Sequence, residues 1–228
     1  MKFLQTGDLH RDFTRFKHLA EKFDEEIAVI ILGDSSINYF LDERDYQFKQ
    51  GLKKYNCVFY CVRGNHEERP EKCGIPLIWD VNVMGEVYCE KEFPYIRYFK
   101  DGGVYNINGK RVLTIGGAYS VDKEYRLNRG LHWFESEQLT KEEKTAILNK
   151  VCGQHFDIVL SHTCPLDYEP TDLFLPFIDQ STVDKRMECF LNKVKECIMF
   201  DKYFFGHYHA DRWERENVRQ LYEDIIEL

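Results

Sequence analysis

The sequence lacks the features that mark several large classes of protein. No apolar run in its 228 residues approaches the length of a transmembrane helix, and the apolar stretch at the N-terminus is too short for a signal peptide. No internal repeat, low-complexity tract or Pro/Gly/Ser-rich linker marks a domain boundary. We therefore expect one soluble domain over residues 1–228, located in the cytoplasm and without a membrane partner, with the oligomeric state left open.

The sequence also lacks an excess of positive charge. Its formal net charge is −8, whereas a protein that grips nucleic acid in general normally presents a basic face to the phosphates. We do not expect nucleic acid as a general partner. It stays open as a substrate, because net charge says nothing about how the charges are arranged.

Zinc-binding CxxC pairs are absent as well, although cysteine itself is not scarce. The eight cysteines form no compact disulfide framework, and several lie within apolar runs such as "NCVFYCV" and "ECIMF". The expectation is therefore buried, reduced thiols in a cytosolic protein. No GxGxxG follows the first apolar run, which argues against a dinucleotide-binding domain.

Six segments share one form, in which a short apolar run switches abruptly to glycine and polar residues. They predict buried strands, at 2–10, 27–36, 56–67, 111–120, 157–165 and 202–211. Amphipathic stretches predict helices at about 12–24, 43–55, 136–150 and 182–196, with Ser136 as the cap of the third. Residues 82–112 alternate polar and apolar, with a hairpin turn at Asn108-Gly109, and the tail also alternates. The pattern indicates an α/β domain with mixed sheets.

Polar side chains follow five of these predicted strands. They are Asp8 and His10, then Asp34, then Asn65 and His66, then His162, and finally His207 and His209. Ligands of open α/β sheets bind at the carboxyl ends of the strands, so we expect these side chains to meet. In an extended chain, residues i and i+2 point to the same side, which lets the DxH and HxH pairs each face one centre. Asn65 and His66 are neighbours, so one can bind metal while the other addresses the substrate.

Each motif also has a simpler interpretation. Asp8 and Asp34 could cap helices that follow them, and His162 alone could be an ordinary hydrogen-bonded histidine. The ordered set is harder to explain in this way, because every member comes at a strand end.

The ordered set resembles the calcineurin-like metallophosphoesterases. That family's pattern runs DxH, GD, GNH followed by an acidic residue, a lone His, and GHxH, and this sequence has "GDLH", "LGDSS", "RGNHEE", "LSHTCP" and "FGHYHAD" in the same order. The matching boxes span residues 8–209. The resemblance implies a four-layer α-β-β-α sandwich of two mixed β-sheets flanked by helices.

The resemblance also implies a metal-dependent phosphoric ester hydrolase with two divalent transition-metal ions. One ion would be held by Asp8, His10, Asp34 and His209, and the other by Asp34, Asn65, His162 and His207. Nitrogen and oxygen ligands suit manganese, iron or zinc, and manganese is our first expectation. A metal-bound hydroxide would attack a phosphomonoester or phosphodiester while His66, the family's catalytic histidine, assists the leaving group.

The sequence departs from the protein-phosphatase branch of the family in the second box, where it lacks that branch's second Asp and the Arg after it, which argues against a dedicated protein phosphatase. That branch has a second Asp three residues after the Asp of the GD box, which orients the catalytic histidine, and this chain has Ile37 there. His66 must then find another orienting group. Arg63 and Arg126 are our candidates for substrate binding, the first in the "RGNHE" box and the second in segment 119–134, which could reach over the metals. Arg63 could equally be a structural ion-pair residue, and segment 119–134 could be a solvated loop or helix.

The alternative function is a non-catalytic interaction scaffold with this fold. Such proteins typically lose metal ligands or the catalytic histidine, and this sequence has all of them.

Overall fold

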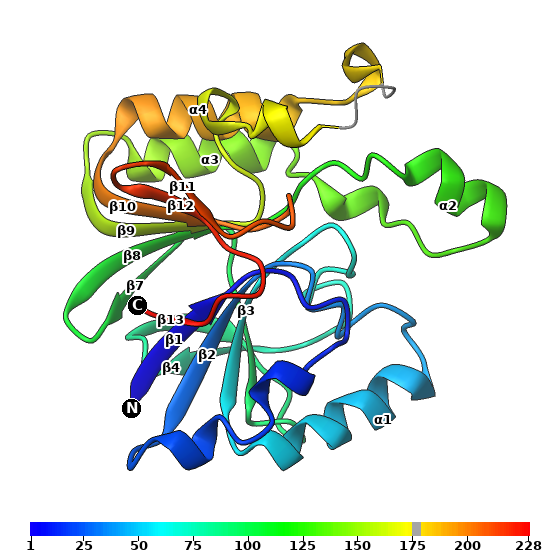
Figure 1. The fold of residues 1–228 in the computed structure, drawn as a ribbon, viewed down its shortest axis with the longest axis vertical. Helices are drawn as coiled ribbons and strands as arrows, with labels where there is room; N and C mark the ends of the chain where they lie inside the picture. Colours follow the sequence, from blue (N-terminus) through cyan, green and yellow to red (C-terminus); the bar gives the residue numbers. More distant parts are fainter. Residues whose placement is uncertain (175–178) are drawn as a thin grey trace.

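The computed structural model describes residues 1–174 and 179–228, which form two β-sheets stacked face to face with helices on both outer sides (Figure 1). The first sheet has seven strands in the order β13-β1-β2-β3-β6-β5-β4. Its strands are β1 (Lys2–Thr6), β2 (Ile27–Leu32), β3 (Val58–Val62), β4 (Leu77–Asp80), β5 (Gly85–Tyr88), β6 (Ile96–Phe99) and β13 (Ile226–Glu227). Strands β1, β2, β3 and β6 are parallel, so their carboxyl ends lie at one edge.

The second sheet has six strands in the order β11-β12-β10-β9-β8-β7. They are β7 (Gly103–Ile107), β8 (Lys110–Ile115), β9 (His155–Ser161), β10 (Met199–Phe205), β11 (Arg212–Arg215) and β12 (Val218–Gln220). Strands β8, β9, β10 and β12 are parallel, and β7 and β11 are antiparallel edge strands. Both sheets are therefore mixed, as predicted.

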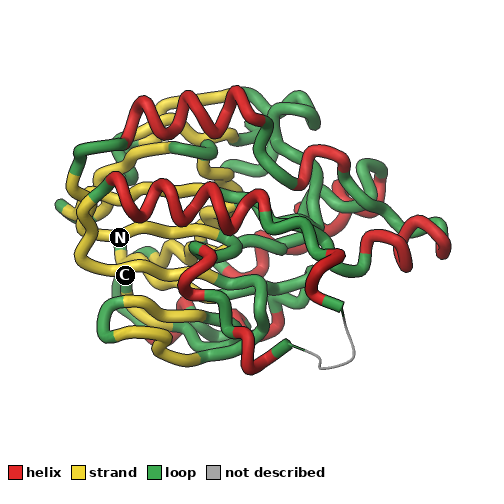
Figure 2. Tube along the Cα trace, turned by 90° about the horizontal axis from the view of Figure 1, so that it is seen from above, coloured by secondary structure: helices red, strands yellow, loops and turns green. Residues whose placement is uncertain are grey.

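The helices cover the outer faces of the two sheets (Figures 1 and 2). Helix α1 (Glu43–Leu52) packs on the first sheet, while α3 (Lys141–Val151) and α4 (Arg186–Cys197) pack on the second. The short helix α2 (Lys123–Arg129) lies on an arm that extends from the body of the molecule (Figure 1). The four-layer sandwich is thus confirmed. In the part of the chain that the structure describes, no helix is both long enough and apolar enough to cross a membrane.

Strand β2 shows why the strands read as continuous apolar runs. All six of its residues are buried, because alternate side chains enter two different cores. Ile30 and Leu32 point between the sheets, where they join Ile158 of the second sheet. Val29 and Ile31 point outward into the core beneath α1. A strand with both faces covered has no polar face to present.

The helix expected at 12–24 is wrong. This segment forms two 3₁₀ turns, Thr14–Phe16 and Ala20–Lys22, and His18 between them has a φ of 64°. The physical reason lies in the spacing of the buried residues Phe13, Phe16 and Leu19. A constant spacing of three fits the 3₁₀ helix, in which residues i and i+3 eclipse, better than the α-helix.

The other helices lie close to their expected positions, but the cap of α3 differs. Thr140 caps this helix, in a capping box with Glu143, and Ser136 lies in a preceding 3₁₀ turn (Glu135–Glu137). Both residue types cap well, but Thr140 has a glutamate three residues later, which completes the reciprocal pair of hydrogen bonds. The prediction of Ser136 as the cap is therefore wrong.

Two local predictions about turns and cysteines have different outcomes. The β7–β8 hairpin turns at Asn108 and Gly109, with φ angles of 51° and 82°, as the sequence predicted. The expectation of reduced thiols is wrong for Cys152 and Cys197, which form a disulfide between the ends of α3 and α4. The spacing of 45 residues hides this pair in the sequence, because only the packing of the two helices brings their ends together.

Candidate dinuclear metal centre

Five loops carry the candidate residues, and the structure brings them together where the two sheets meet. The loops after β1, β2 and β3 supply Asp8 and His10, Asp34, and Asn65 and His66, while those after β9 and β10 supply His162, His207 and His209. Three overlapping sets place their ligand atoms within 4.8 Å of one another: Asp8, His10 and His209; His10, Asp34 and His66; Asp8, Asp34 and His162.

Several of these residues adopt an unusual backbone. His10, Asp34, His207 and His209 have φ angles of 45°, 49°, 69° and 53°. Residues other than glycine rarely occupy this left-handed region, and such strain concentrates at functional sites. The DxH and HxH pairs therefore converge through tight turns, and not through the extended chain that we assumed.

The first group of ligand atoms is formed by Asp8, His10 and His209. The Nε2 atom of His209 lies 3.1 Å from Asp8 Oδ2 and 3.0 Å from His10 Nε2. His10 Nε2 also lies 3.9 Å from Asp34 Oδ2. The Asp8 carboxylate is 1% exposed, and its Oδ2 makes no hydrogen bond of good geometry within the described residues.

The second group is formed by Asp34, Asn65 and His162, with His207 beside them. His162 Nε2 lies 2.8 Å from Asn65 Oδ1 and 3.5 Å from Asp34 Oδ1. The ring of His207 packs edge-on against that of His162, with 4.9 Å between the centroids. Asp34 is thus within reach of both groups, as a bridging carboxylate must be.

The helix-cap interpretation of the two aspartates finds no support in these contacts. Asp34 Oδ1 accepts hydrogen bonds from the backbone N–H groups of Asn65 and His66, both 2.8 Å long. Asp8 Oδ1 accepts from the backbone N–H of His207 at 3.0 Å. The helix after β2 is capped by another residue, Asp42. Asp8 and Asp34 therefore link one ligand loop to the next.

The charge states suit metal ligation. Burial alone would raise the pKa of Asp34, but the neighbouring His66, His162 and His10 outweigh it and hold this pKa well below its usual value. Removal from solvent, reinforced by His162, lowers the pKa of His207 to about 3. Asp34 is therefore held ionised and His207 neutral, which are the forms that bind a cation, whereas the hydrogen bond to Asp8 raises the pKa of His209.

The donor set passes a direct test of fit to a metal ion. His162 Nδ1 lies 2.8 Å from the carbonyl oxygen of Leu32, which can only accept, so Nδ1 carries the hydrogen and Nε2 presents a lone pair. The glycines leave room for this cluster. A Cβ on Gly33, whose φ is +97°, would lie 2.0 Å from His162 Nδ1, and one on Gly64 would lie 2.0 Å from Asp34 Oδ1.

His66 contacts the guanidinium group of Arg126, which lies on the arm that carries α2. Nη2 of Arg126 in α2 lies 2.7 Å from His66 Nε2 and also contacts His66 Nδ1. Ile37, where the related phosphatases have an orienting Asp, is fully buried in the core beneath α1. Arg126 is therefore the group that the structure places against His66.

Arg63 has a different environment. Its Nε and Nη2 lie 2.9 Å from Asp101 Oδ2, and its Nη1 donates to the backbone carbonyl of Glu137 at 2.7 Å. All three guanidinium nitrogens therefore contact protein groups. These contacts favour the structural ion-pair interpretation of Arg63 over substrate binding.

Sequence reasoning assigned no role to the buried glutamate that follows His66. Glu67 Oε1 accepts from the backbone N–H of Gly64 at 2.9 Å, and its Oε2 accepts from the hydroxyl of Ser35. Glu67 thus braces the loops that carry Asp34 and Asn65. The acidic residue after GNH in the family pattern was the signal that could have identified it.

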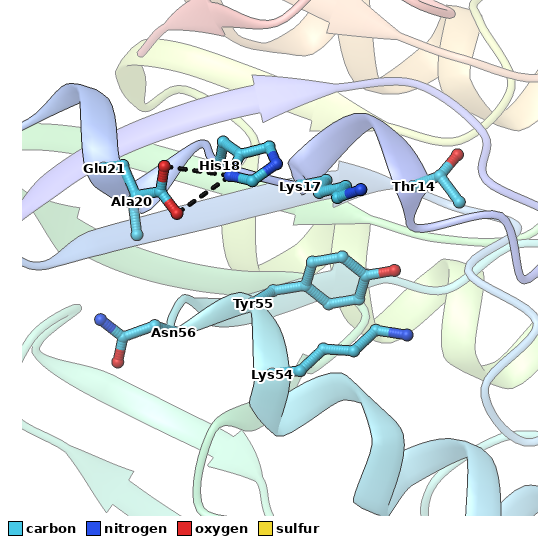
Figure 3. Close-up of a pocket in the computed structure, with 8 residues that line it drawn as sticks. All are labelled: Thr14, Lys17, His18, Ala20, Glu21, Lys54, Tyr55 and Asn56. Carbon is cyan, nitrogen blue, oxygen red and sulfur yellow. Dashed lines mark hydrogen bonds and ion pairs between the residues drawn. The ribbon is translucent and has the colours of Figure 1, made fainter.

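A separate hollow lies away from this centre, between the 3₁₀ turns after β1 and the residues after α1 (Figure 3). It has a volume of about 790 Å³ and contains none of the candidate ligands; its lining residues are Thr14, Lys17, His18, Ala20, Glu21, Lys54, Tyr55 and Asn56. His18 is paired with Glu21 across its rim at 2.9 Å.

The chain matches the family model of calcineurin-like phosphoesterases over residues 1–211, and it belongs to this family. A crystal structure of the protein TT1561 of Thermus thermophilus is similar in fold, with 13% identity, a TM-score of 0.48, and coverage of 96% of this chain and 87% of that one. Another crystal structure shares 14% identity with a TM-score of 0.49, covering 96% and 89% of the two chains. No curated protein matches the chain.

Proposed function

We propose that the chain hydrolyses a phosphate ester at a dinuclear metal centre. Asp8, His10, Asp34 and His209 hold one ion, and Asp34, Asn65, His162 and His207 hold the other, with Asp34 as the bridge. The single observation that carries this proposal is the convergence of these seven ligands from five loops, with His66 beside them. When bound, the ions supply Lewis acidity and activate water for attack on phosphorus.

His66 is proposed to deliver a proton to the leaving-group oxygen. Its Nε2 lies 3.8 Å from Asp34 Oδ2, close enough for the ring to face an ester bound over the bridging carboxylate. General acid catalysis needs a group within hydrogen-bond reach of the leaving oxygen, and a half-buried histidine beside the ligands meets that need.

Arg126 is proposed to hold the phosphoryl oxygens. The imidazole of His66 has at most one nitrogen that can accept a hydrogen bond, yet Nη2 contacts both of its nitrogens. The guanidinium and the ring therefore cannot fully satisfy each other. A phosphoryl oxygen between them would accept from both, so we place it there.

The substrate is proposed to be a phosphomonoester or phosphodiester, and manganese remains our first choice of metal. A non-catalytic scaffold is not favoured, because such proteins typically lose metal ligands or the catalytic histidine, whereas this chain has all seven candidate ligands and His66. The cytoplasmic location and the single domain over residues 1–228 also remain proposals.

The test is hydrolysis of nitrophenyl phosphate esters with added manganese, compared with a chelated sample and with Asp34→Asn. We expect two bound ions per chain and metal-dependent turnover in the wild type. Asp34→Asn should lose both, since the bridge contributes to each ion. A metal-free wild-type protein after manganese loading, or an Asp34→Asn variant with normal metal content and activity, would disprove the proposal.

A further inference from the structure

Two residues outside the family's motifs, Ser120 and Glu137, form a chain of hydrogen bonds with the side-chain amide of Asn65. Asn65 Nδ2 donates to Ser120 Oγ at 2.9 Å. Ser120 Oγ in turn donates to Glu137 Oε2 at 2.5 Å, and the backbone N–H of Ser120 donates to Glu137 Oε1 at 3.2 Å. All three residues are at most 2% exposed. Water therefore does not compete for these hydrogen bonds.

The number of hydrogens on the Ser120 hydroxyl determines which group donates in each of these hydrogen bonds. A serine hydroxyl has one hydrogen and two lone pairs. Because Glu137 receives that hydrogen, the oxygen of Ser120 can only accept from Asn65. The NH₂ end of the Asn65 amide must then face Ser120, and its oxygen must face the opposite way.

The opposite direction is the metal site. Asn65 Oδ1 lies 2.8 Å from His162 Nε2, the nitrogen that presents a lone pair because Nδ1 donates to Leu32. Asp34 Oδ1 lies 3.5 Å from the same nitrogen. Three electron-pair donors thus converge with no hydrogen between them, an arrangement that a cation stabilises.

We propose that Ser120 and Glu137 are positioning residues for the second metal ion, because they fix the Asn65 amide with its oxygen toward that ion. This inference rests on the proposed dinuclear centre. It also assigns a second role to residues 119–137, since the segment that carries Arg126 to the substrate also orients a metal ligand.

The test is calorimetric titration of manganese into the metal-free full-length protein. The wild type should bind two ions. Ser120→Ala should weaken one of them by about 10- to 100-fold, as is typical when a group that orients a metal ligand is lost, and should leave the other unchanged. Ser120→Thr, which keeps the hydroxyl, should restore most of the affinity.

Two further variants separate positioning from general stabilisation. Ser136→Ala is the matched control, because this hydroxyl lies in the same segment and pairs with Glu68, which is not one of the proposed ligands. It should leave both affinities unchanged. Glu137→Gln keeps the size of the side chain but offers a donor to Ser120, which frees the hydroxyl to donate to Asn65 and allows the amide to flip. It should weaken the same ion about tenfold.

A double mutant makes the result decisive. If Ser120 acts through Asn65, Ser120→Ala should have no further effect on manganese affinity in an Asn65→Ala background. A wild type that binds two ions together with an unaffected Ser120→Ala variant would overturn the inference and leave the proposed function intact. Equal weakening of both ions, or additive effects in the double mutant, would also overturn it. A wild type that binds no second ion would instead refute the dinuclear centre itself.

Discussion

Replacing Arg126 by alanine gives the sharpest test of how the substrate is held. The guanidinium is 6% exposed and is anchored on two sides, by Asp122 Oδ2 at 2.8 Å from Nε and by the carbonyl of His132 at 3.1 Å from Nη1. Only Nη2 faces His66. The arm therefore presents one donor, already oriented, to the place where we put the phosphoryl oxygen.

The expected loss follows from the charge and the geometry. Two unit charges about 4 Å apart interact by ~4 kcal/mol at an effective dielectric constant of about 20, which is an upper limit for this contact. Removal of one oriented donor from an oxyanion site typically costs about 10²- to 10³-fold in kcat. We expect a decrease of that size in kcat/KM for Arg126→Ala. Arg126→Lys should recover only part of it, because an ammonium cannot reproduce the planar guanidinium.

Unfolding should not account for this loss. The variant leaves Asp122 without its partner, but the Asp122 side chain is 42% exposed, so no charge is left buried and unpaired. The assay is steady-state hydrolysis of a nitrophenyl phosphate, with metal content measured on the same samples. Arg129→Ala, which removes an exposed arginine of the same helix, is the matched control and should behave as wild type. If Arg126→Ala keeps kcat/KM within about threefold of wild type, or loses metal along with activity, the reasoning is wrong.

Two further predictions concern a proton donor and a buried acid. His66→Ala should keep both metals and slow an alkyl ester by ~10²- to 10⁴-fold, with a smaller loss for a nitrophenyl ester, whose leaving group needs little protonation; equal losses on both esters would exclude general acid catalysis. Burial, with Glu169 adding to it and Lys185 opposing it, raises the pKa of Glu188 above its usual 4.5, and Glu188 Oε2 has no hydrogen-bond partner within the described residues. The stability that Glu188 contributes is therefore present below pH 4.5 and is lost as the pH rises. In urea unfolding, the free energy of unfolding of Glu188→Gln should rise relative to that of the wild type between pH 4.5 and pH 8. Parallel pH profiles of the two proteins would contradict this.

The strand ends were predictable because they follow from local patterns. Asp8, Asp34 and His162 each follow a buried apolar run, and parallel strands bring their carboxyl ends to one edge without help from other residues. The mixed character of the sheets could be predicted from these patterns, whereas their stacking as two sheets was implied only by the family resemblance. Short segments of the sequence each predict a buried strand, and together they predict the α/β fold class.

The surroundings of the site could not be predicted, because they depend on contacts between distant residues. Ser120 meets Asn65 across 55 positions, and Arg126 meets His66 across 60. No periodicity in the sequence links such pairs. The 3₁₀ turn that contains Phe16 also has a distant partner, since Phe16 packs against Phe59 of β3.

The division of the ligands between the two sheets has a consequence for how the protein folds. The first sheet carries Asp8, Asp34 and Asn65, and the second carries His162, His207 and His209, so neither sheet alone can form the proposed centre. A folding intermediate with only one sheet assembled should bind manganese weakly, and tight binding should appear only when the apolar layer between the sheets closes. Each ion would then stabilise the docked sheets over the partly folded states that do not bind it, by ~2.7 kcal/mol at a free metal concentration of about 100 times its Kd. The rate at which the refolding protein takes up metal would therefore report the rate at which the two sheets dock.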